Sequence, residues 1–132
     1  MVHDGLAWCS GQIASNVEGV LVARGRLGED VDVDAGVRCA RQCAANALGQ
    51  LSRALGGLQA IDRLIRVTVY VAAAPAFSEH AAVGHGASTL FEAVLGARGS
   101  HCRSAVGVSS LPLGTPVEVE VVAAVQPAHA AP

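Results

Sequence analysis

The sequence predicts a two-layer α+β domain in which two helices cover one face of a single mixed β-sheet. Three observations support this fold class. Two segments place apolar residues at steps of three and four, which is typical of amphipathic helices. Short valine-rich segments lie on either side of these helices, which is typical of strands. The chain has 132 residues, a length that suits one domain.

The first two strands are predicted at residues 5–13 and 17–22. A glycine-broken loop at residues 24–32 follows them. Asp32 and Asp34 then stand where helix N-caps belong, because a short carboxylate can accept hydrogen bonds from the free N–H groups of a first helical turn.

The first helix is the clearest element of the sequence, since its apolar and polar residues fall on separate faces. Gly56 and Gly57 end it, because glycine adopts the left-handed conformation of a helix C-terminus at little cost. The predicted core face consists of Val37, Ala40, Ala44, Leu48, Leu51 and Leu55.

A third strand is predicted at residues 63–73, because valines alternate there with polar residues and the side-chain period of a strand is two. A second helix is predicted at residues 80–95, although Gly84 and Gly86 weaken its first turn. The residues that this helix is expected to bury are Val83, Ala87, Leu90 and Val94.

Two more strands are predicted at residues 103–108 and 117–125. Together the elements make one domain over residues 1–126, and residues 127–132 are expected to be a disordered tail. Hydrophobic residues make up 52% of the chain but aromatic residues only 3%, so the core must consist of Ala, Val and Leu. The sheet face opposite the helices also needs cover, and a partner subunit is the simplest cover.

Composition and charge argue against several classes of function. The net charge is −2 and no basic stripe with interleaved aromatics occurs, so we expect no nucleic-acid partner. No apolar run reaches the roughly 18 residues of a membrane span, and the N-terminus lacks the features of a signal peptide. Cys9, Cys39, Cys43 and Cys102 show no disulfide-framework spacing, so we expect a cytoplasmic protein. Cys39 and Cys43 lack a second pair of ligands, which favours buried core thiols over a metal site.

Three charged residues stand out because they interrupt apolar strands: Arg103, Glu118 and Glu120. A guanidinium presents a planar fork of donors that matches a carboxylate, and it is costly to bury unpaired. Arg103 must therefore face an anion, a neighbouring glutamate or a solvated cleft. Glu118 and Glu120 share one face of their strand because the side-chain period is two. Arg103 and Glu118 are expected to meet if their strands pair.

The motifs along the chain resemble the RidA/YjgF family of reactive-intermediate deaminases, which were once described as L-PSP endoribonucleases. The resemblance is carried, in chain order, by "SGQI" at 10–13, "RVTVYV" at 66–71, "RSAVGV" at 103–108, "LPLG" at 111–114 and "VEVEVVA" at 117–123. It covers nearly the whole chain and is greatest to a divergent branch of the family. It implies a chorismate-mutase-like fold and a homotrimer with ligand clefts between subunits.

The resemblance also implies roles for individual residues. Arg103 matches the arginine that holds the substrate carboxylate, and Glu118 matches the glutamate that handles the hydrolytic water. Ser10, the serine of "SGQ", matches a substrate-binding position. The implied reaction is the hydrolysis of an enamine or imine derived from an amino acid, which releases ammonia and a 2-keto acid. It needs no cofactor and no metal.

The chain departs from the family pattern in three places. The early strand of the family, with a tyrosine that touches the ligand, is expected to be missing from the N-terminus. His85 stands where the family has an asparagine, so we expect it either to line the cleft or to be a plain surface residue. Ala105 stands where the best-known enzymes have a cysteine, and Cys102 comes just before Arg103.

The remaining candidates leave alternatives open. His101 shares a face with Arg103 and is expected either to tune the substrate cleft or to be a structural histidine. Cys102 and Cys9 are expected to be buried thiols, since a nucleophile would need a partner base. Arg103 and Glu118 are also compatible with a structural ion pair at a subunit interface. At the level of function, the alternatives are a pathway-specific tailoring enzyme acting on another carboxylate-bearing intermediate and a non-catalytic trimer that binds small carboxylates.

Overall fold

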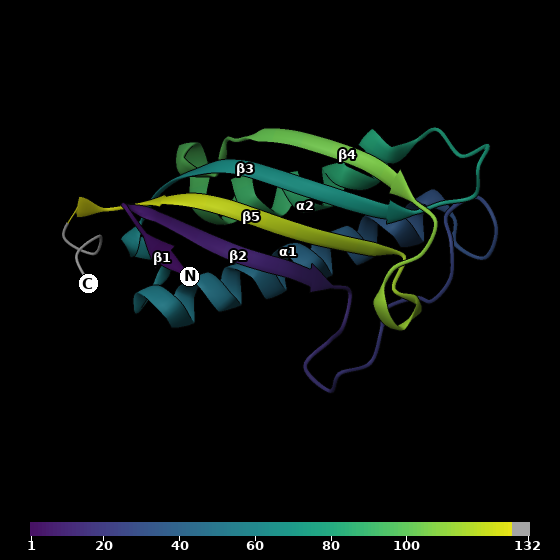
Figure 1. Ribbon diagram of the computed structural model, residues 1–132, viewed down its shortest axis with the longest axis horizontal. Helices are drawn as coiled ribbons and strands as arrows, with labels where there is room; N and C mark the ends of the chain where they lie inside the picture. Colours follow the sequence, from purple (N-terminus) through teal and green to yellow (C-terminus); the bar gives the residue numbers. More distant parts are fainter. Residues whose placement is uncertain (128–132) are drawn as a thin grey trace.

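One mixed sheet runs through the protein, whose computed structural model describes residues 1–127. Its five strands lie in the order β1-β2-β5-β3-β4 (Figure 1). β3 and β4 are parallel, and all other neighbours are antiparallel. The strands are β1 (Val2–His3), β2 (Leu6–Ile13), β3 (Ile61–Ala72), β4 (Cys102–Val108) and β5 (Val117–Val125). Apart from its first residue, the tail expected at 127–132 lies outside the described residues.

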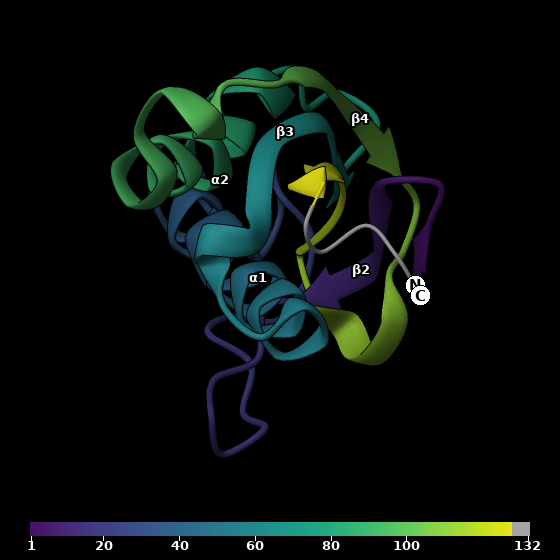
Figure 2. The same ribbon diagram turned by 90° about the vertical axis from the view of Figure 1, so that its left-hand side faces the viewer.

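Two helices lie on the same face of this sheet (Figure 2), which confirms the predicted α+β class. They are α1 (Val33–Leu55) and α2 (His80–Leu95), and neither is long and apolar enough to cross a bilayer within the described chain. Asp32 caps α1 by accepting a hydrogen bond from the N–H of Ala35 at 2.8 Å, and Gly56 ends it in the left-handed conformation. Three short 3-10 turns complete the structure: η1 (Leu58–Ala60), η2 (Gly96–Gly99) and η3 (Pro112–Gly114).

The core lies between the helices and the inner face of the sheet. Alternate residues of β5, from Val117 to Val125, are buried against α1. Gly86 allows the two helices to approach closely, because a Cβ at this position would lie 2.2 Å from the carbonyl oxygen of Val37. The glycine that weakens the helical propensity of α2 is therefore required by its packing on α1.

The predicted strand at residues 17–22 is wrong. These residues belong to a loop that projects from the body of the molecule (Figure 1) and contains one isolated bridge, between Ser15 and Leu21. Asn16 holds the loop, since its side-chain oxygen accepts from two backbone N–H groups at 3.0 Å. Short local bonds of this kind compete with strand pairing. The additional strand of the sheet is β1, which precedes the loop and pairs with β2.

Val94 is also not where the sequence places it. The helical period puts it on the buried face of α2, but it is 45% exposed. Burial at this end of α2 shifts to Leu95, where the helix passes into the 3-10 turn η2. The other predicted core residues of α2 are buried.

Candidate functional site

Arg103 lies on β4 at the edge of the sheet, and its side chain faces α2. Its Nη1 atom donates a hydrogen bond to Ser88 Oγ at 3.0 Å and lies 3.3 Å from Nδ1 of His85. Its Nη2 atom is 3.5 Å from the carbonyl oxygen of Ala81. Gly84 leaves room for the guanidinium, because a Cβ on Gly84 would lie 3.3 Å from both Cζ and Nε of Arg103.

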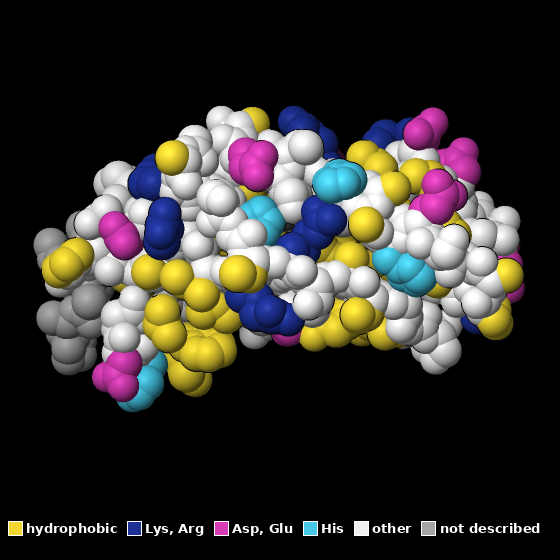
Figure 3. All heavy atoms as spheres, turned by 90° about the horizontal axis from the view of Figure 1, so that it is seen from above, with side chains coloured by type: hydrophobic (Ala, Val, Ile, Leu, Met, Phe, Trp, Pro, Cys, Tyr) yellow, Lys and Arg dark blue, Asp and Glu magenta, His cyan; other side chains and the backbone are white. Residues whose placement is uncertain are grey.

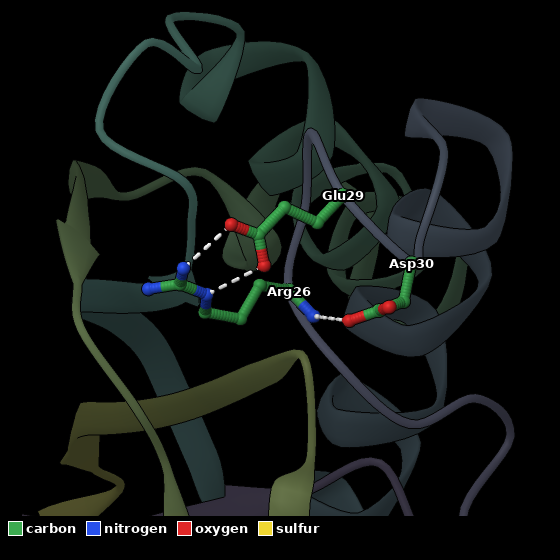
Figure 4. Close-up of polar contacts among 3 residues, drawn as sticks. All are labelled: Arg26, Glu29 and Asp30. Carbon is green, nitrogen blue, oxygen red and sulfur yellow. Dashed lines mark hydrogen bonds and ion pairs between the residues drawn. The ribbon is translucent and has the colours of Figure 1, made fainter.

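Arg103 has no carboxylate partner within residues 1–127. Arg26 shows what a paired arginine looks like in the same protein (Figure 4): its Nη2 and Nε atoms contact both oxygens of Glu29, at 2.6 and 3.0 Å. The hydrogen bond from Arg26 lowers the pKa of Glu29. The partners of Arg103 are instead a hydroxyl, an imidazole and a carbonyl. Its Nε–H and one N–H of Nη2 have no partner in the described chain, so this edge of the guanidinium is free for an anion.

The face of the molecule on the β4 side carries several arginine and histidine side chains. Seen from the β4 edge (Figure 3), arginine and histidine side chains lie next to one another near the middle of the face. His85 is exposed and Arg103 is half-buried. Arg103 is therefore partly accessible to solvent.

His101 lies beside the same cluster, which confirms that it shares a face with Arg103. Its Nε2 atom is 2.8 Å from Ser88 Oγ, and its Nδ1 atom is 2.6 Å from the carbonyl oxygen of Gly99. The imidazole also packs edge-on against Phe91, with ring centroids 5.8 Å apart. Both ring nitrogens are thus engaged by the protein.

Glu118 lies on β5, on the sheet face away from the helices. Gly11 of β2 lies close to its side chain, and a Cβ there would lie 2.2 Å from Glu118 Oε2. The carboxyl group therefore occupies the space that the missing side chain leaves. Burial, and then the nearby charge of Glu120, raises the pKa of Glu118. Glu120 itself accepts a hydrogen bond from the Tyr70 hydroxyl at 2.6 Å.

Ser10 is close to this second group of residues in the sheet. It lies in the irregular part of β2 between Cys9 and Gln12, where the register against β5 shifts. Its side chain is exposed, and a cavity of about 180 Å³ opens beside it between β2 and α1. The bulge brings Ser10 and Gly11 to the stretch of β5 that carries the glutamates.

The expected meeting of Arg103 and Glu118 does not occur within one protomer. Strands β4 and β5 do not pair, because β3 lies between them. The two side chains also project from opposite faces: Arg103 contacts α2, whereas Glu118 alternates with the buried valines of β5. The candidate site therefore consists of two separate groups, which we call the arginine group (Arg103, His85, Ser88, His101) and the glutamate group (Glu118, Gly11, Ser10).

Cys39 and Cys43 agree with expectation, whereas Cys9 and Cys102 are less buried than expected. Cys39 and Cys43 are fully buried, and burial raises the pKa of both thiols, that of Cys39 to about 11. Cys9 is half-buried, and burial raises its pKa as well. Cys102 was expected to be buried but is exposed, because its side chain leaves β4 on the face that the helices do not cover. Among residues 1–127, no cluster of three or more histidine, cysteine or acidic side chains is placed to bind a metal.

Sequence reasoning missed Ser88, Gly84 and Gly11. Ser88 falls outside the predicted buried face of α2 (Val83, Ala87, Leu90 and Val94), so the helical period gives no signal for it. Gly84 and Gly11 carry none, because only the structure shows that an arginine or a glutamate fills the space beside each glycine.

The candidate site of this two-layer α+β fold thus has two parts: an edge arginine without an acidic partner in residues 1–127, and a glutamate on the opposite face of the sheet. The family model described as Endoribonuclease L-PSP matches residues 1–125. The chain therefore belongs to this family, the RidA/YjgF family.

Individual relatives agree with this assignment. Protein TCP17 of Trypanosoma cruzi is 40% identical over 112 residues, which cover 84% of this chain and 69% of TCP17. The crystal structure of Atu1372 from Agrobacterium tumefaciens, a protein of unknown function, is 39% identical. Atu1372 superposes on this chain with a TM-score of 0.92, over 95% of this chain and 80% of the Atu1372 chain. A crystal structure from Shewanella oneidensis is 28% identical, with a TM-score of 0.90 over 95% of this chain and 82% of its own.

Proposed function

We propose that this protein is a hydrolase that deaminates enamine and imine intermediates derived from amino acids and releases a 2-keto acid and ammonia. The observation that carries the proposal is the unpaired edge of Arg103. A permanently charged group that is half-buried and has no acidic partner in residues 1–127 is suited to bind an anion. A carboxylate next to the reacting C=N bond is an anion of the right shape for its free Nε and Nη2 donors.

Each predicted residue has a role in this proposal. Arg103 binds the substrate carboxylate and so fixes the position of the neighbouring electrophilic carbon. His85 is exposed beside Arg103, with its Nδ1 atom 3.3 Å from Nη1, and would help to bind the substrate. Ser10 contributes a hydroxyl from the glutamate group, and Glu118 acts as the proton carrier. His101 belongs to the arginine group, and its role is developed below.

The reaction balances with Glu118 as the only acid–base group. The substrate reacts as the protonated imine. The Glu118 carboxylate accepts a proton from water while the water oxygen forms a bond to the imine carbon, which gives a neutral carbinolamine. The protonated Glu118 then delivers this proton to the nitrogen, so that the C–N bond breaks and ammonia leaves with the bonding electron pair. The Glu118 carboxylate takes the proton of the carbinolamine hydroxyl as the carbonyl of the keto acid forms, and Glu118 then releases this proton to solvent. A raised pKa suits a carboxyl group that must both take and give a proton near neutral pH.

The two groups act together only if different subunits supply them, because they lie on opposite faces of the sheet. The face away from the helices also exposes apolar side chains, such as Trp8 at 49% and Val106 at 43%. We propose a homotrimer in which the arginine group of one subunit faces the glutamate group of the next. Four free cysteines suit a reducing, cytoplasmic environment.

The first experiment measures turnover directly. 2-Aminoacrylate or 2-iminobutyrate is generated in situ, and the decay of the imine signal is followed with the wild type, with Arg103→Ala and with Arg24→Ala as a surface control. We expect acceleration by the wild type and the control, and loss of acceleration with Arg103→Ala. No acceleration by the wild type would refute deamination. Binding of 2-keto acids without turnover would then identify a carboxylate-binding protein.

The second experiment tests whether the site is shared between subunits. Arg103→Ala and Glu118→Gln protomers are unfolded, mixed in equal amounts and refolded. In a shared site, random assembly should restore about a quarter of the sites, because some interfaces then combine an intact arginine with an intact glutamate. No recovery above the two separate variants would contradict a shared site.

A further inference from the structure

We propose that Ser88 and His101 are positioning residues that orient Arg103 through a directed hydrogen-bond chain. The chain runs from the carbonyl oxygen of Gly99 through His101 and Ser88 to Nη1 of Arg103. It turns the Nε–Nη2 edge of the guanidinium toward the substrate. The role in catalysis rests on the proposed function, but the orientation of Arg103 does not.

The direction of the chain follows from one backbone carbonyl. The oxygen of Gly99 can only accept, so Nδ1 of His101 carries the proton across the 2.6 Å contact. In the Nδ1–H tautomer, which the proposal assigns to His101, Nε2 is an acceptor and the Ser88 hydroxyl donates to it at 2.8 Å. With its only proton used, Ser88 Oγ is left as an acceptor for Nη1 of Arg103 at 3.0 Å. Every member of the chain has a single consistent role.

The chain is rigid because each member is held by the core. Ser88 is only 8% exposed, so its hydroxyl has no ready exchange with water. Phe91 contacts the edge of the His101 ring at an interplanar angle of 85°. Gly99 cannot shift easily, since a Cβ there would lie 2.4 Å from the backbone oxygen of Phe91. An exposed arginine would instead sample many rotamers.

The hydrogen-bond chain determines which N–H groups of Arg103 remain free to bind an anion. Ser88 and His85 both lie within hydrogen-bond distance of Nη1 and can use its two protons. The long contact to the Ala81 carbonyl, at 3.5 Å, leaves Nε–H and one N–H of Nη2 available. These two donors lie side by side in the guanidinium plane and match the two oxygens of a carboxylate. The chain therefore favours a planar carboxylate over a single-point anion such as chloride.

Nuclear magnetic resonance of the Arg103 guanidinium tests the orientation without substrate. In the wild type, rotation about the Cζ–Nε bond should be slow, because Nη1 is anchored. Ser88→Ala removes a hydrogen bond to a charged group, so the rotation should become about tenfold faster or more. Thr89→Ala is the matched control, since Thr89 is the next residue of α2 and bonds only to helix carbonyls. Equal rotation rates in the wild type and Ser88→Ala would overturn the proposal.

His101 offers an independent pair of variants. His101→Phe keeps a ring against Phe91 but cannot accept from Ser88, so it should also speed the rotation. His101→Gln places an amide oxygen that can accept from Ser88, and it should restore much of the anchoring. Faster rotation in His101→Gln than in His101→Phe would contradict the directed chain.

Kinetics then separate this inference from the proposed function. If the wild type turns over imines, Ser88→Ala should raise KM about tenfold, with a smaller effect on kcat. In an Arg103→Ala background, where turnover is lost, the same change should not weaken the residual binding of a 2-keto acid any further, because Ser88 acts through Arg103. Additive losses would overturn the positioning role. If the wild type shows no turnover, the proposed function fails, while the rotation rates still decide whether the chain orients Arg103.

Discussion

Arg103 and Glu118 lie on opposite faces of the same sheet, and their surroundings differ as much as their positions. Arg103 is held by named hydrogen bonds from α2, and its charge is permanent. The Glu118 carboxyl group occupies the space beside Gly11 that a side chain would otherwise fill, and burial and the charge of Glu120 raise its pKa. Hydrogen bonds fix the orientation of the Arg103 guanidinium, whereas burial and a neighbouring charge shift the pKa of the Glu118 carboxyl group.

The difference shows what each half of the site must supply. An arginine that binds substrate does not change its charge during turnover, so its hydrogen bonds to the protein serve to orient it. A proton carrier must change charge during each turnover, so the protein controls its solvation and its charged neighbours. Substitutions in the arginine group should therefore act on substrate binding, and those in the glutamate group on rate and pH dependence.

The largest effect is expected from Glu118→Gln. The amide cannot carry the proton, so kcat should fall by about 10²–10⁴-fold, while binding of a 2-keto acid should be retained. Steady-state kinetics and calorimetric titration of the keto acid measure the two quantities. Glu120→Gln is the control on the same face of the strand. An equal loss of kcat in both variants would mean that Glu118 has no special role.

The second-largest effect is expected from Gly11→Ala. The new Cβ would meet the end of the Glu118 side chain, which is flexible and can swing away, so the fold should survive. A displaced carboxyl group should lower kcat by up to about a hundredfold with little change in Tm. In a Glu118→Gln background the same substitution should cost nothing more. A further loss there would show that Gly11 acts on something other than Glu118.

Glu120→Gln should change the pH profile rather than the maximal rate. Glu118 works as a base only when it is deprotonated, so the rate falls as the pH drops through its pKa. Besides burial, the charge of Glu120 raises that pKa, and its removal should lower it. The acidic limb of the kcat profile should therefore move to lower pH. A shift to higher pH would contradict the electrostatic coupling between the two glutamates.

Most of the fold could be predicted from the sequence, because it depends on local patterns. The helical period and the caps at Asp32 and Gly56 fix α1, and the alternation of valines fixes β3 and β5. The strand at residues 17–22 failed because three valines there imitate a strand, whereas Asn16 closes a loop with its own side chain. Strand propensity describes a half-buried surface, and these valines are exposed.

Less of the candidate site could be predicted, because it depends on which strands are neighbours. Strand periodicity correctly places His101 on the face of Arg103. It says nothing about the order of strands, so the insertion of β3 between β4 and β5 separates Arg103 from Glu118 without any local signal. Ser88 likewise becomes meaningful only when α2 packs against β4 and brings its hydroxyl to Arg103.

The smallest effect on activity is expected from Gly84→Ala, which should stabilise α2 but displace the Arg103 guanidinium. Alanine is favoured over glycine inside a helix by about 0.4–1 kcal/mol, so Gly84→Ala should hold or raise Tm. Its Cβ would lie 3.3 Å from Cζ and Nε of Arg103, which forces the guanidinium to move by a few tenths of an ångström. KM should therefore rise a few-fold. Gly49→Ala in α1 is the matched control, because no atom lies within 4 Å of its new Cβ, and it should raise Tm without changing KM. If both variants gained stability and kept the wild-type KM, the position of the guanidinium would not limit substrate binding. The proposal that the protein orients Arg103 for binding, in contrast to the pKa control at Glu118, would then lose its support.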